Sequence, residues 1–436
     1  MNTHRLPRHV LGPVALLISL YFHPEPGGGA NTALNRALIL QKVGYRVYVV
    51  CGFPSYPTGR VIEKKYKGKY FFSEKMGDLT IIRLRLLSLE SKGYLRRFIL
   101  FINFNFLMLI WMPRILKISE KVDLVYALAP ILFSSSIGFF YSKVTKSFFV
   151  YEVSAFWPEE LVAIKGKLYF ILLYFGKVFA KISYIVPDMI VVISNSAAKY
   201  ITKKYKPNAQ IYPMPIGVDP KRYPIRSKES ARRELINKRI LPDSDENKFI
   251  LLYAGVITKV TKVENVFYVA NKLKKEQDII FLVVGEGEEK ARLQKYKQDN
   301  AIDNLYLLPF QDSALVPYLI SAADACIMPL SSEPIYGTTI PTKFFDYLAC
   351  HKPQIGICAG ELAELINSNG IGVTVNDGEI DKLAEKIVTL KNSPLLLDSM
   401  VQNSRILLHD FTLDSLAVKF NIAMKECMAI RNKRIR

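Results

Sequence analysis

Short apolar runs without polar alternation recur along the first half of the chain and are separated by longer stretches with apolar residues at helical spacing. Such runs of four to eight residues are typical of a parallel sheet that is covered on both faces. The expected strands are Val14–Leu20, Arg46–Cys51, Thr80–Leu84, Leu124–Ala127, Phe148–Glu152 and Met189–Ser194. The expected helices are Asn31–Val43, Arg96–Ser119, Ile131–Lys143 and Leu168–Ile185. The pattern therefore predicts a doubly wound α/β domain.

The same alternation starts again after a charged segment with few apolar residues, Pro220–Lys248, which is predicted to be a linker. The expected strands of this second array are Phe249–Ala254, Ile280–Gly285, Leu305–Leu308, Ala325–Met328, Gln354–Cys358 and Gly372–Val375. The expected helices are Lys262–Lys275, Glu288–Gln298, Leu315–Ala322, Lys343–Ala349, Ile380–Leu390 and a last one, Leu413–Ile430.

Two such arrays predict two doubly wound domains, with a ligand bound beyond the carboxyl ends of the strands, in the cleft between the domains. We place the N-terminal domain at residues 1–215 and the C-terminal domain at 216–411, followed by a helical segment at 412–436. At 436 residues, half of them apolar, the chain is long enough to bury two cores.

The formal charge of +20 points to an anionic partner, which can be a nucleic acid, a phosphorylated ligand or an anionic membrane surface. A solvated basic face is the simpler alternative. The five cysteines include no Cys-x-x-Cys pair and no cluster with histidine, so neither a zinc site nor a disulfide framework is indicated. Buried thiols in odd number fit a reducing cytosol.

Two apolar segments need to be weighed against membrane insertion. Val14–Phe22 follows basic residues as in a signal peptide, but it spans nine residues and ends in a glycine-rich turn, so we predict a buried first strand. Phe98–Met112 is fifteen residues long and is interrupted by Asn103 and Asn105. A spanning helix needs roughly 20 residues, so we expect that this segment does not cross a bilayer.

The segment Thr339–Glu364, TIPTKFFDYLACHKPQIGICAGELAE, carries the most specific chemistry. Lys343 and Asp346 are three positions apart and share one face of a predicted helix. Such a face can hold both a phosphate and a ribose. A buried strand follows, and then Gly360 and Glu361 open another helix. The alternative is a purely structural helix–strand–helix unit.

This segment resembles the nucleotide-sugar site of the GT4-type retaining glycosyltransferases, which have the GT-B fold. The resemblance covers roughly residues 15–425 and implies two Rossmann-like domains, with the acceptor on the first and the nucleotide sugar on the second. It also implies that the C-terminal helix packs back on the first domain. Many members place two glutamates eight residues apart, the first for the donor sugar and the second for the ribose. Asp346 stands at the second position and Thr338 at the first, where hydroxyls of Thr338 and Thr339 can substitute.

The loop after the first strand, YFHPEPGGGAN, is similar to the glycine-rich first loop of the family at Pro24, Gly28 and Gly29. Glycines let a ligand approach the backbone, and the free N–H groups of the next helix favour an anion. A plain tight turn is the alternative. His23 is a candidate catalytic residue because a histidine beside the cleft can titrate near neutrality.

Two further segments resemble a subgroup of the family that acts on lipid-linked acceptors: FPSYPTGRV, which starts at Phe53, and YEVSAFWPEEL, which starts at Tyr151. Relatives tend to carry an aspartate two residues before the tryptophan, where this chain has Ala155. Glu152 and Glu159 are the local substitutes for an acid–base group. Trp157 is as well explained by packing.

In the second array, a strand ending at Gly255 is followed by Lys259 and Lys262 before a helix. A helix N-terminus together with lysines is a suitable site for a diphosphate, although many relatives have an arginine where this chain has Val256. Gly285 belongs to a Gly-x-Gly turn in the order expected for the family. The resemblance further implies that Pro309 and Phe310 frame the nucleobase.

Basic residues beside the long apolar helix, including Lys64, Lys65 and Arg96, suggest contact with an anionic membrane surface. A core helix is the alternative. We predict a retaining glycosyltransferase of hexosyltransferase type, cytoplasmic and peripheral on the inner face of the cell membrane. It is expected to move a sugar from a nucleoside-diphosphate sugar to a lipid-linked or saccharide acceptor in cell-surface glycan synthesis. No cofactor, metal or nucleic acid is expected.

Two other functions remain open. The same fold is compatible with a nucleotide-sugar epimerase or phosphorylase, but neither carboxylate or histidine pairs nor a cofactor lysine is recognisable. The charge alone is compatible with a nucleic-acid-binding protein without enzymatic activity, although no nucleic-acid-binding motif occurs.

Overall fold

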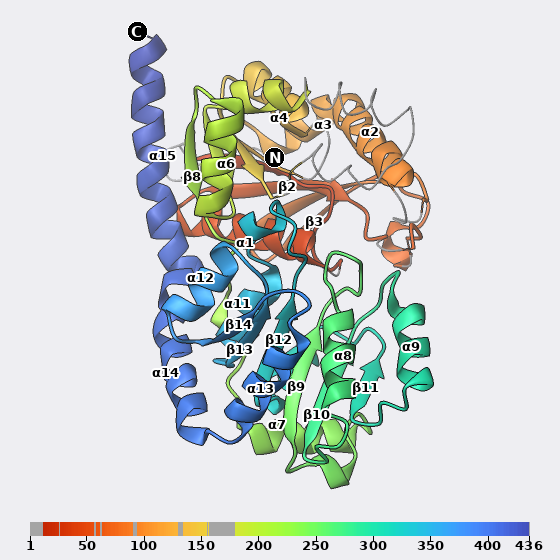
Figure 1. Ribbon diagram of the computed structural model, residues 1–436. Helices are drawn as coiled ribbons and strands as arrows, with labels where there is room; N and C mark the ends of the chain where they lie inside the picture. Colours follow the sequence, from red (N-terminus) through yellow and green to blue (C-terminus); the bar gives the residue numbers. More distant parts are fainter. Residues whose placement is uncertain are drawn as a thin grey trace, which may run out of the picture. The chain divides into compact units, whose positions relative to one another are not determined.

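The chain forms two compact units. The computed structural model describes residues 12–25, 27–55, 58–61, 63–89, 94–129, 134–154, 156 and 179–435. Unit 1 comprises Met1–Ile216 together with Leu413–Arg436, and unit 2 comprises Gly217–Thr412. These bounds lie one residue from those predicted. Each unit is a sheet with helices on both faces (Figure 1).

Unit 1 contains an eight-stranded sheet in the order β3-β4-β2-β1-β5-β6-β7-β8. All neighbouring strands are parallel except β3, which pairs antiparallel with β4. The strands are β1 (Val14–Ile18), β2 (Arg46–Gly52), β3 (Phe71–Met76), β4 (Leu79–Leu84), β5 (Leu124–Leu128), β6 (Phe148–Val153), β7 (Met189–Val192) and β8 (Gln210–Pro213). The prediction of a buried first strand is confirmed, since all five residues of β1 are buried.

Helices cover both faces of this sheet. They include α1 (Gly28–Lys42), α2 (Tyr94–Ile110), α3 (Met112–Ser119), α4 (Ser134–Thr145), α6 (Asn195–Tyr205) and α15 (Leu413–Ile435). Of the expected helix Leu168–Ile185, residues 179–185 are helical and the rest lies outside the described residues.

The single helix predicted at Arg96–Ser119 is wrong, because the chain bends at Trp111 and continues as α3 with Pro113 in its first turn. A proline has no N–H to continue the helical hydrogen bonds. In the part of the chain that the structure describes, no single helix is long and apolar enough to cross a bilayer. Arg96–Ile110 and Met112–Ser119, bent by 66°, pass as a pair on length and composition alone.

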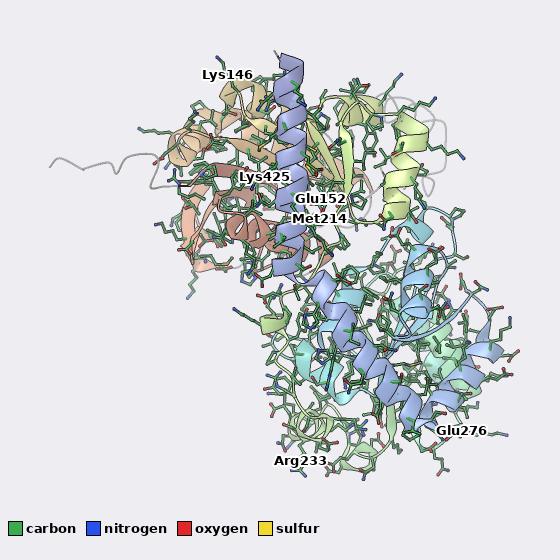
Figure 2. The ribbon with its side chains drawn as sticks, turned by 90° about the vertical axis from the view of Figure 1, so that its left-hand side faces the viewer. Lys146, Glu152, Met214, Arg233, Glu276 and Lys425 are labelled. Carbon is green, nitrogen blue, oxygen red and sulfur yellow. The ribbon has the colours of Figure 1, made fainter. Side chains whose placement is uncertain are left out.

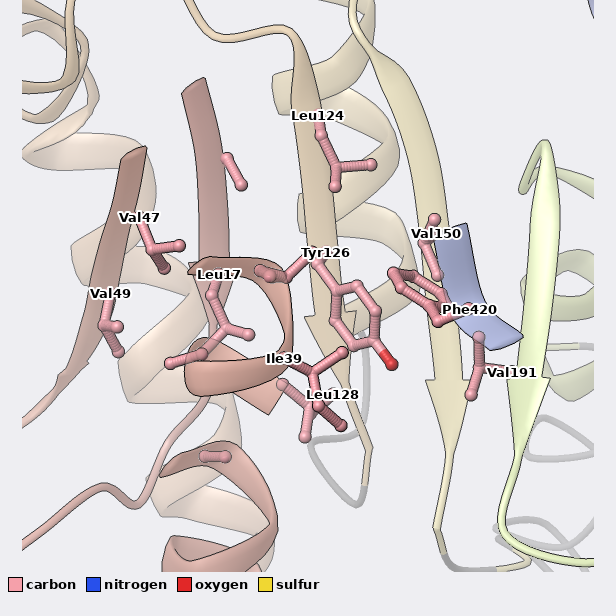
Figure 3. Packing of buried hydrophobic residues seen from close by; sticks show 14 of the residues in the cluster. Leu17, Ile39, Val47, Val49, Leu124, Tyr126, Leu128, Val150, Val191 and Phe420 are labelled. Carbon is pink, nitrogen blue, oxygen red and sulfur yellow. The ribbon is translucent and has the colours of Figure 1, made fainter. Parts of the chain in front are cut away.

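The core of unit 1 includes the C-terminal helix. Leu416, Phe420 and Met424 of α15 are buried in the cluster that the strands and α1 form. The ring of Phe420 packs edge-on against Tyr126 of β5, with 6.1 Å between the ring centroids (Figure 3). Residues at the two ends of the sequence therefore share one core.

Unit 2 contains a six-stranded sheet in the order β11-β10-β9-β12-β13-β14, in which all neighbours are parallel. The strands are β9 (Phe249–Ala254), β10 (Ile279–Val284), β11 (Leu305–Leu308), β12 (Ala325–Pro329), β13 (Gln354–Ile357) and β14 (Gly372–Val375). The predicted parallel α/β class is confirmed for both units.

The helices of unit 2 lie before, between and after these strands. They include η4 (Pro220–Arg222), α7 (Lys228–Asn237), η5 (Asp243–Asp245), α8 (Glu264–Lys272), α9 (Lys290–Asp299), α10 (Val316–Ala322), η6 (Tyr336–Thr338), α11 (Thr342–Ala349), α12 (Glu361–Ser368), α13 (Ile380–Lys391) and α14 (Pro394–Phe411).

The linker predicted at Pro220–Lys248 is wrong, because this segment is part of unit 2. Its helix α7 buries Ala231, Arg232 and Leu235. The Arg232 guanidinium donates to the carbonyl of Ala322 at 3.0 Å and to the Asp324 carboxylate at 2.6 Å. The many charged residues of this segment suggested a linker. One of them, Arg232 of α7, instead forms hydrogen bonds inside unit 2.

Candidate active site

Four loops of unit 2 meet at the carboxyl edge of its sheet through close backbone contacts at glycines. Gly255 follows β9, Gly285 follows β10 and Gly360 follows β13. A Cβ atom on Gly285 would lie 1.9 Å from the carbonyl oxygen of Gly255, and one on Gly360 would lie 2.3 Å from that of Gly337. Only glycine permits these approaches. The contacts join the loops in two pairs beyond the strand ends, where ligands of such sheets bind.

The ammonium of Lys343 lies beside the first of these loops, the one after β9. Its Nζ donates to the hydroxyl of Tyr253 at 3.0 Å and lies 4.1 Å from the centroid of the same ring. The Tyr253 hydroxyl in turn donates to the carbonyl of Val256 at 2.5 Å. A side chain at Gly255 would meet Lys343 Nζ at 2.9 Å. The lysine charge is therefore fixed beside the backbone of the loop after β9.

Asp346 lies one helical turn beyond Lys343 on α11. Its Oδ1 accepts a hydrogen bond of 2.6 Å from the hydroxyl of Tyr223, which is buried. Burial raises the pKa of Asp346 to about 6, although the hydrogen bond from Tyr223 and the charges of Arg222 and Lys343 act in the opposite direction. The same burial, with the neighbouring carboxylate, raises the pKa of Tyr223, so its hydroxyl remains a donor.

The two lysines predicted to hold a diphosphate differ in their surroundings. Lys262 lies 3.7 Å from Oε1 of Glu264 and 3.9 Å from Oδ2 of Asp377, so its charge is shared with two carboxylates. Lys259 is exposed, and no ion pair is recorded for it among the described residues. The ammonium of Lys343, in contrast, lies next to the backbone of Gly255.

The other predicted donor-site residues lie on the same edge of unit 2. Thr338 ends η6, and its hydroxyl donates to the carbonyl of Ile335 at 2.6 Å, while Thr339 follows it. Glu361 is the first residue of α12, next to Gly360. Phe310 comes two residues after β11 and is 57% exposed, which leaves its ring open to a flat partner such as a nucleobase.

The predicted site residues of unit 1 lie after its first strand. His23 is exposed, and its carbonyl accepts a hydrogen bond of 2.6 Å from the buried Arg83. Gly28 and Gly29 are the first two residues of α1. The sequence reasoning missed Glu25. Its buried carboxylate accepts a hydrogen bond of 2.9 Å from the backbone N–H of Ser55. This bond connects the loop after β1 with the loop that starts at Phe53. Glu159, Trp157 and Ala155 lie outside the described residues.

Glu152 is placed where a ligand cannot reach it. Its carboxylate is fully buried and accepts from Arg36 Nε at 2.8 Å, Arg36 Nη2 at 2.9 Å and the Tyr126 hydroxyl at 2.5 Å. Arg36 also donates to the carbonyls of Met214 and Pro215, at 2.8 and 2.9 Å. Figure 2 labels Glu152 and Met214 within unit 1. The network anchors the last residues of unit 1 before the chain enters unit 2, and its role is structural.

Residues 237–406 match the family model described as Glycosyl transferases group 1. We refer to this matched region, residues 237–406, as the group 1 domain. Of the predicted catalytic and donor-binding residues, all but His23, Gly28, Gly29, Glu152 and Glu159 lie within this domain. Tyr223 lies outside it, and since it is distant in sequence from the motif that it contacts, no local spacing pointed to it.

The chain is also similar to the Escherichia coli K12 protein WcaI, whose name describes a glycosyl transferase of colanic acid biosynthesis. The two are 31% identical over 156 residues, which are 35% of this chain and 37% of WcaI. The chain thus matches little more than a third of the length of that relative.

The whole chain resembles solved structures at low sequence identity. Sucrose-phosphate synthase from Thermosynechococcus elongatus has a TM-score of 0.73 and 16% identity, covering 96% of this chain and 100% of its own. Anabaena HepE in complex with UDP and glucose has a TM-score of 0.66 and 15% identity, covering 94% and 99%. These likenesses establish the predicted GT-B fold.

Proposed function

We propose that this protein is a retaining glycosyltransferase that moves a sugar from a nucleoside-diphosphate sugar to a hydroxyl of a lipid-linked or saccharide acceptor. The observation that carries the proposal is the fixed ammonium of Lys343 beside Gly255, with the Asp346 carboxylate one turn along the same helix. A cation and a hydroxyl-accepting group side by side suit the diphosphate and the ribose of such a donor. HepE, which shares the fold, has been solved with UDP and glucose.

The chemistry needs charge stabilisation more than a general base. The bond between the anomeric carbon and the diphosphate oxygen breaks, and its electron pair stays on the diphosphate. The acceptor oxygen bonds to that carbon on the same face, and its proton passes to the departing diphosphate. Positive groups placed where this charge develops lower the barrier. Lys343, Lys259 and Lys262 are the candidate groups, and Gly255 and Gly285 let their two loops and the Lys343 ammonium approach one another closely there.

The remaining donor contacts are assigned by position. The backbone and hydroxyls of Thr338 and Thr339, with Glu361 at the start of α12, face the sugar. Phe310 frames the nucleobase. Gly28 and Gly29 are further candidates for donor binding, and His23 and Glu159 are candidate catalytic residues. No metal or cofactor takes part in this scheme.

The test is a donor screen with purified full-length protein. UDP- and GDP-sugars are offered with a lipid-linked acceptor extract, and the product linkage is analysed by NMR. We expect transfer from one donor class with the anomeric configuration retained. An inverted product would contradict retention. Release of an epimerised sugar without an acceptor would favour an epimerase, and the absence of both turnover and nucleotide binding would overturn the proposal.

A second part of the proposal concerns the membrane. Helix α2 buries one face, with Phe104 and Met108, yet its outer face is also apolar. The exposed residues of that outer face are Ile99, Ile102, Phe106, Leu109 and Ile110. A helix on the surface of a globular protein normally presents polar residues to water, and a continuous apolar face marks an interaction site.

Basic residues surround this face and identify its partner. Arg96, Arg97, Arg114 and Lys117 are exposed on α2 and α3, and Lys64, Lys65, Lys67 and Lys69 are exposed before β3. Phe140 and Val144 of α4, which packs against α2, extend the apolar area. Apolar residues flanked by cations are typical of helices that lie on anionic lipid. We therefore place the acceptor side of the enzyme at an anionic membrane surface.

Vesicle binding tests this part separately. The double variant Ile102→Ser with Phe106→Ser should bind phosphatidylglycerol vesicles at least about tenfold more weakly, because two large side chains no longer enter the lipid. Ile225→Ser, which changes a residue of unit 2 that is 75% exposed, is the matched control and should bind like the unmodified protein. Equal binding of all three proteins would contradict the assignment.

A further inference from the structure

Tyr223 is held in place by its own segment before it reaches α11. Gly217 has a positive φ of 72°, and the Asp219 carboxylate accepts from the backbone N–H of Lys221 at 3.0 Å. Pro220 then opens the short helix η4, and the N–H of Tyr223 donates to the carbonyl of Pro220 at 3.0 Å. The backbone therefore fixes the direction of the Tyr223 side chain independently of any ligand.

The hydroxyl of Tyr223 occupies only one oxygen of the Asp346 carboxylate. It donates to Oδ1 at 2.6 Å. Among the residues that the structure describes, no hydrogen bond to Oδ2 and no ion pair to either oxygen within 4.0 Å is recorded for Asp346, and the side chain is only partly buried. An ionised carboxylate accepts hydrogen bonds and donates none. Oδ2 is thus an acceptor that remains available for hydroxyl groups.

Without Tyr223, this carboxylate has competing partners. The charges of Lys343, three residues earlier on the same helix face, and of Arg222 both act on Asp346. A freely rotating carboxylate would pair with Lys343 and would withdraw the cation from the glycine-rich edge. The bond from Tyr223 fixes the rotamer and keeps the two charges apart, each facing its own part of a ligand.

We infer that Tyr223 is a positioning residue for ribose recognition: it orients the Asp346 carboxylate so that Oδ2 accepts the ribose hydroxyls of the donor. This inference rests on the proposed function, because it requires a nucleoside diphosphate at the carboxyl edge of unit 2. Tyr223 lies outside the group 1 domain, and by orienting Asp346 it contributes to the ligand specificity of that domain.

The test measures ligand discrimination instead of stability. Dissociation constants are determined by calorimetry for UDP and GDP and, for whichever binds, for its 2′-deoxy and 3′-deoxy forms. The unmodified protein should lose about tenfold in affinity for at least one deoxy form, the scale of one good hydrogen bond. Tyr223→Phe keeps the ring. It should lower the affinity for the parent nucleotide about tenfold and change the affinity for the deoxy form by less than about twofold. In turnover, its KM for the donor should rise with kcat nearly unchanged.

Tyr306→Phe is the matched control, because the Tyr306 hydroxyl donates to the Asp245 carboxylate at 2.7 Å elsewhere in unit 2. It removes a bond of the same kind and should leave the discrimination intact. Asp346→Asn keeps the shape of the side chain and serves as the second variant if Tyr223→Phe does not fold. It should lose the discrimination in the same way.

The two proposals fail differently. If neither UDP nor GDP binds, the proposed function is overturned and the inference falls with it. If a nucleotide binds but Tyr223→Phe, or Asp346→Asn in its place, still discriminates against the deoxy forms as the unmodified protein does, the inference alone is overturned. A loss of discrimination in Tyr306→Phe as well would also overturn it, because the effect would then be a general loss of rigidity.

Discussion

Each unit contains a tyrosine hydroxyl that donates to a carboxylate, but the two pairs have different surroundings. In unit 1, Glu152 accepts from Tyr126 and, through both of its oxygens, from Arg36, and it is completely buried. In unit 2, Asp346 accepts from Tyr223 through Oδ1 alone and keeps part of its surface exposed. Both oxygens of the first carboxylate are bonded inside a buried network, while the second has one oxygen to offer a ligand.

This difference separates a structural group from a binding group without reference to any relative. Burial lowers the pKa of the Arg36 guanidinium, but Glu152 and Tyr126 more than offset that effect and raise it. At Asp346 burial prevails, and the pKa of the carboxyl rises to about 6. A carboxylate whose hydrogen-bonding and charge partners within the fold are incomplete is a better candidate for ligand contact than one whose partners are complete.

The largest effect is expected from removing Arg36, the cation of the buried pair with Glu152. Arg36→Met should destabilise the protein by about 3–5 kcal/mol, because the buried Glu152 carboxylate would lose the guanidinium that donates to both of its oxygens. The measurement is urea denaturation followed by circular dichroism. Lys42→Met on the same helix removes the ion pair with Asp414, which is exposed, and should change stability by less than about 1 kcal/mol. A similar loss for both variants would contradict the distinction.

The next effect concerns catalysis in unit 2. Lys343→Met should lower kcat/KM for the donor about 100-fold, the loss typical of one charge-stabilising group, which corresponds to about 2.7 kcal/mol. Thermal melting should change little, because Lys343 lies at the edge of the sheet. Lys238→Met, which removes a half-exposed lysine directly after α7, serves as the control. If Lys262→Met reduces transfer more than Lys343→Met does, the main cation is Lys262, despite its two acidic neighbours.

A third prediction uses the titration of Asp346, which Tyr223, Arg222 and Lys343 face. Its pKa is about 6 in the folded chain and ordinarily 3.8, so the folded state binds its proton more tightly. The stability from this group is therefore complete below about pH 4 and is lost as the pH rises to about 6, by at most about 3 kcal/mol. Donor affinity should change in the opposite direction, because the ionised form accepts the ribose hydroxyls.

Comparison with Asp346→Asn isolates this titration from those of the nucleotide and of other groups. Melting temperature and the dissociation constant for the nucleotide are measured from pH 4.5 to 7.5 in both proteins. The unmodified protein should lose melting temperature relative to the variant as the pH rises, while it gains affinity relative to the variant. Parallel profiles for the two proteins would show that Asp346 contributes to neither property.

The sequence predicted those parts of the fold and of the site that depend on local pattern. Leu305–Leu308 and Gly372–Val375 are strands with the predicted bounds, because apolar residues between polar turns leave few alternatives. The strand β3, FFSEKM, was missed because it pairs antiparallel at the sheet edge and alternates in burial. The spacing of Lys343 and Asp346 showed one helix face, but Tyr223 is 123 residues from Asp346 and only the fold brings it there.

The smallest effect sharpens the comparison between the two tyrosines. Tyr126→Phe removes one donor from a carboxylate that Arg36 still holds through both oxygens, so stability should fall by only about 1–2 kcal/mol. The ring remains packed against Phe420 (Figure 3). Nucleotide affinity, measured as for Tyr223→Phe, should stay within about twofold of the unmodified protein. If Tyr126→Phe weakened the nucleotide as strongly as Tyr223→Phe does, acceptor capacity would not be what distinguishes the two carboxylates.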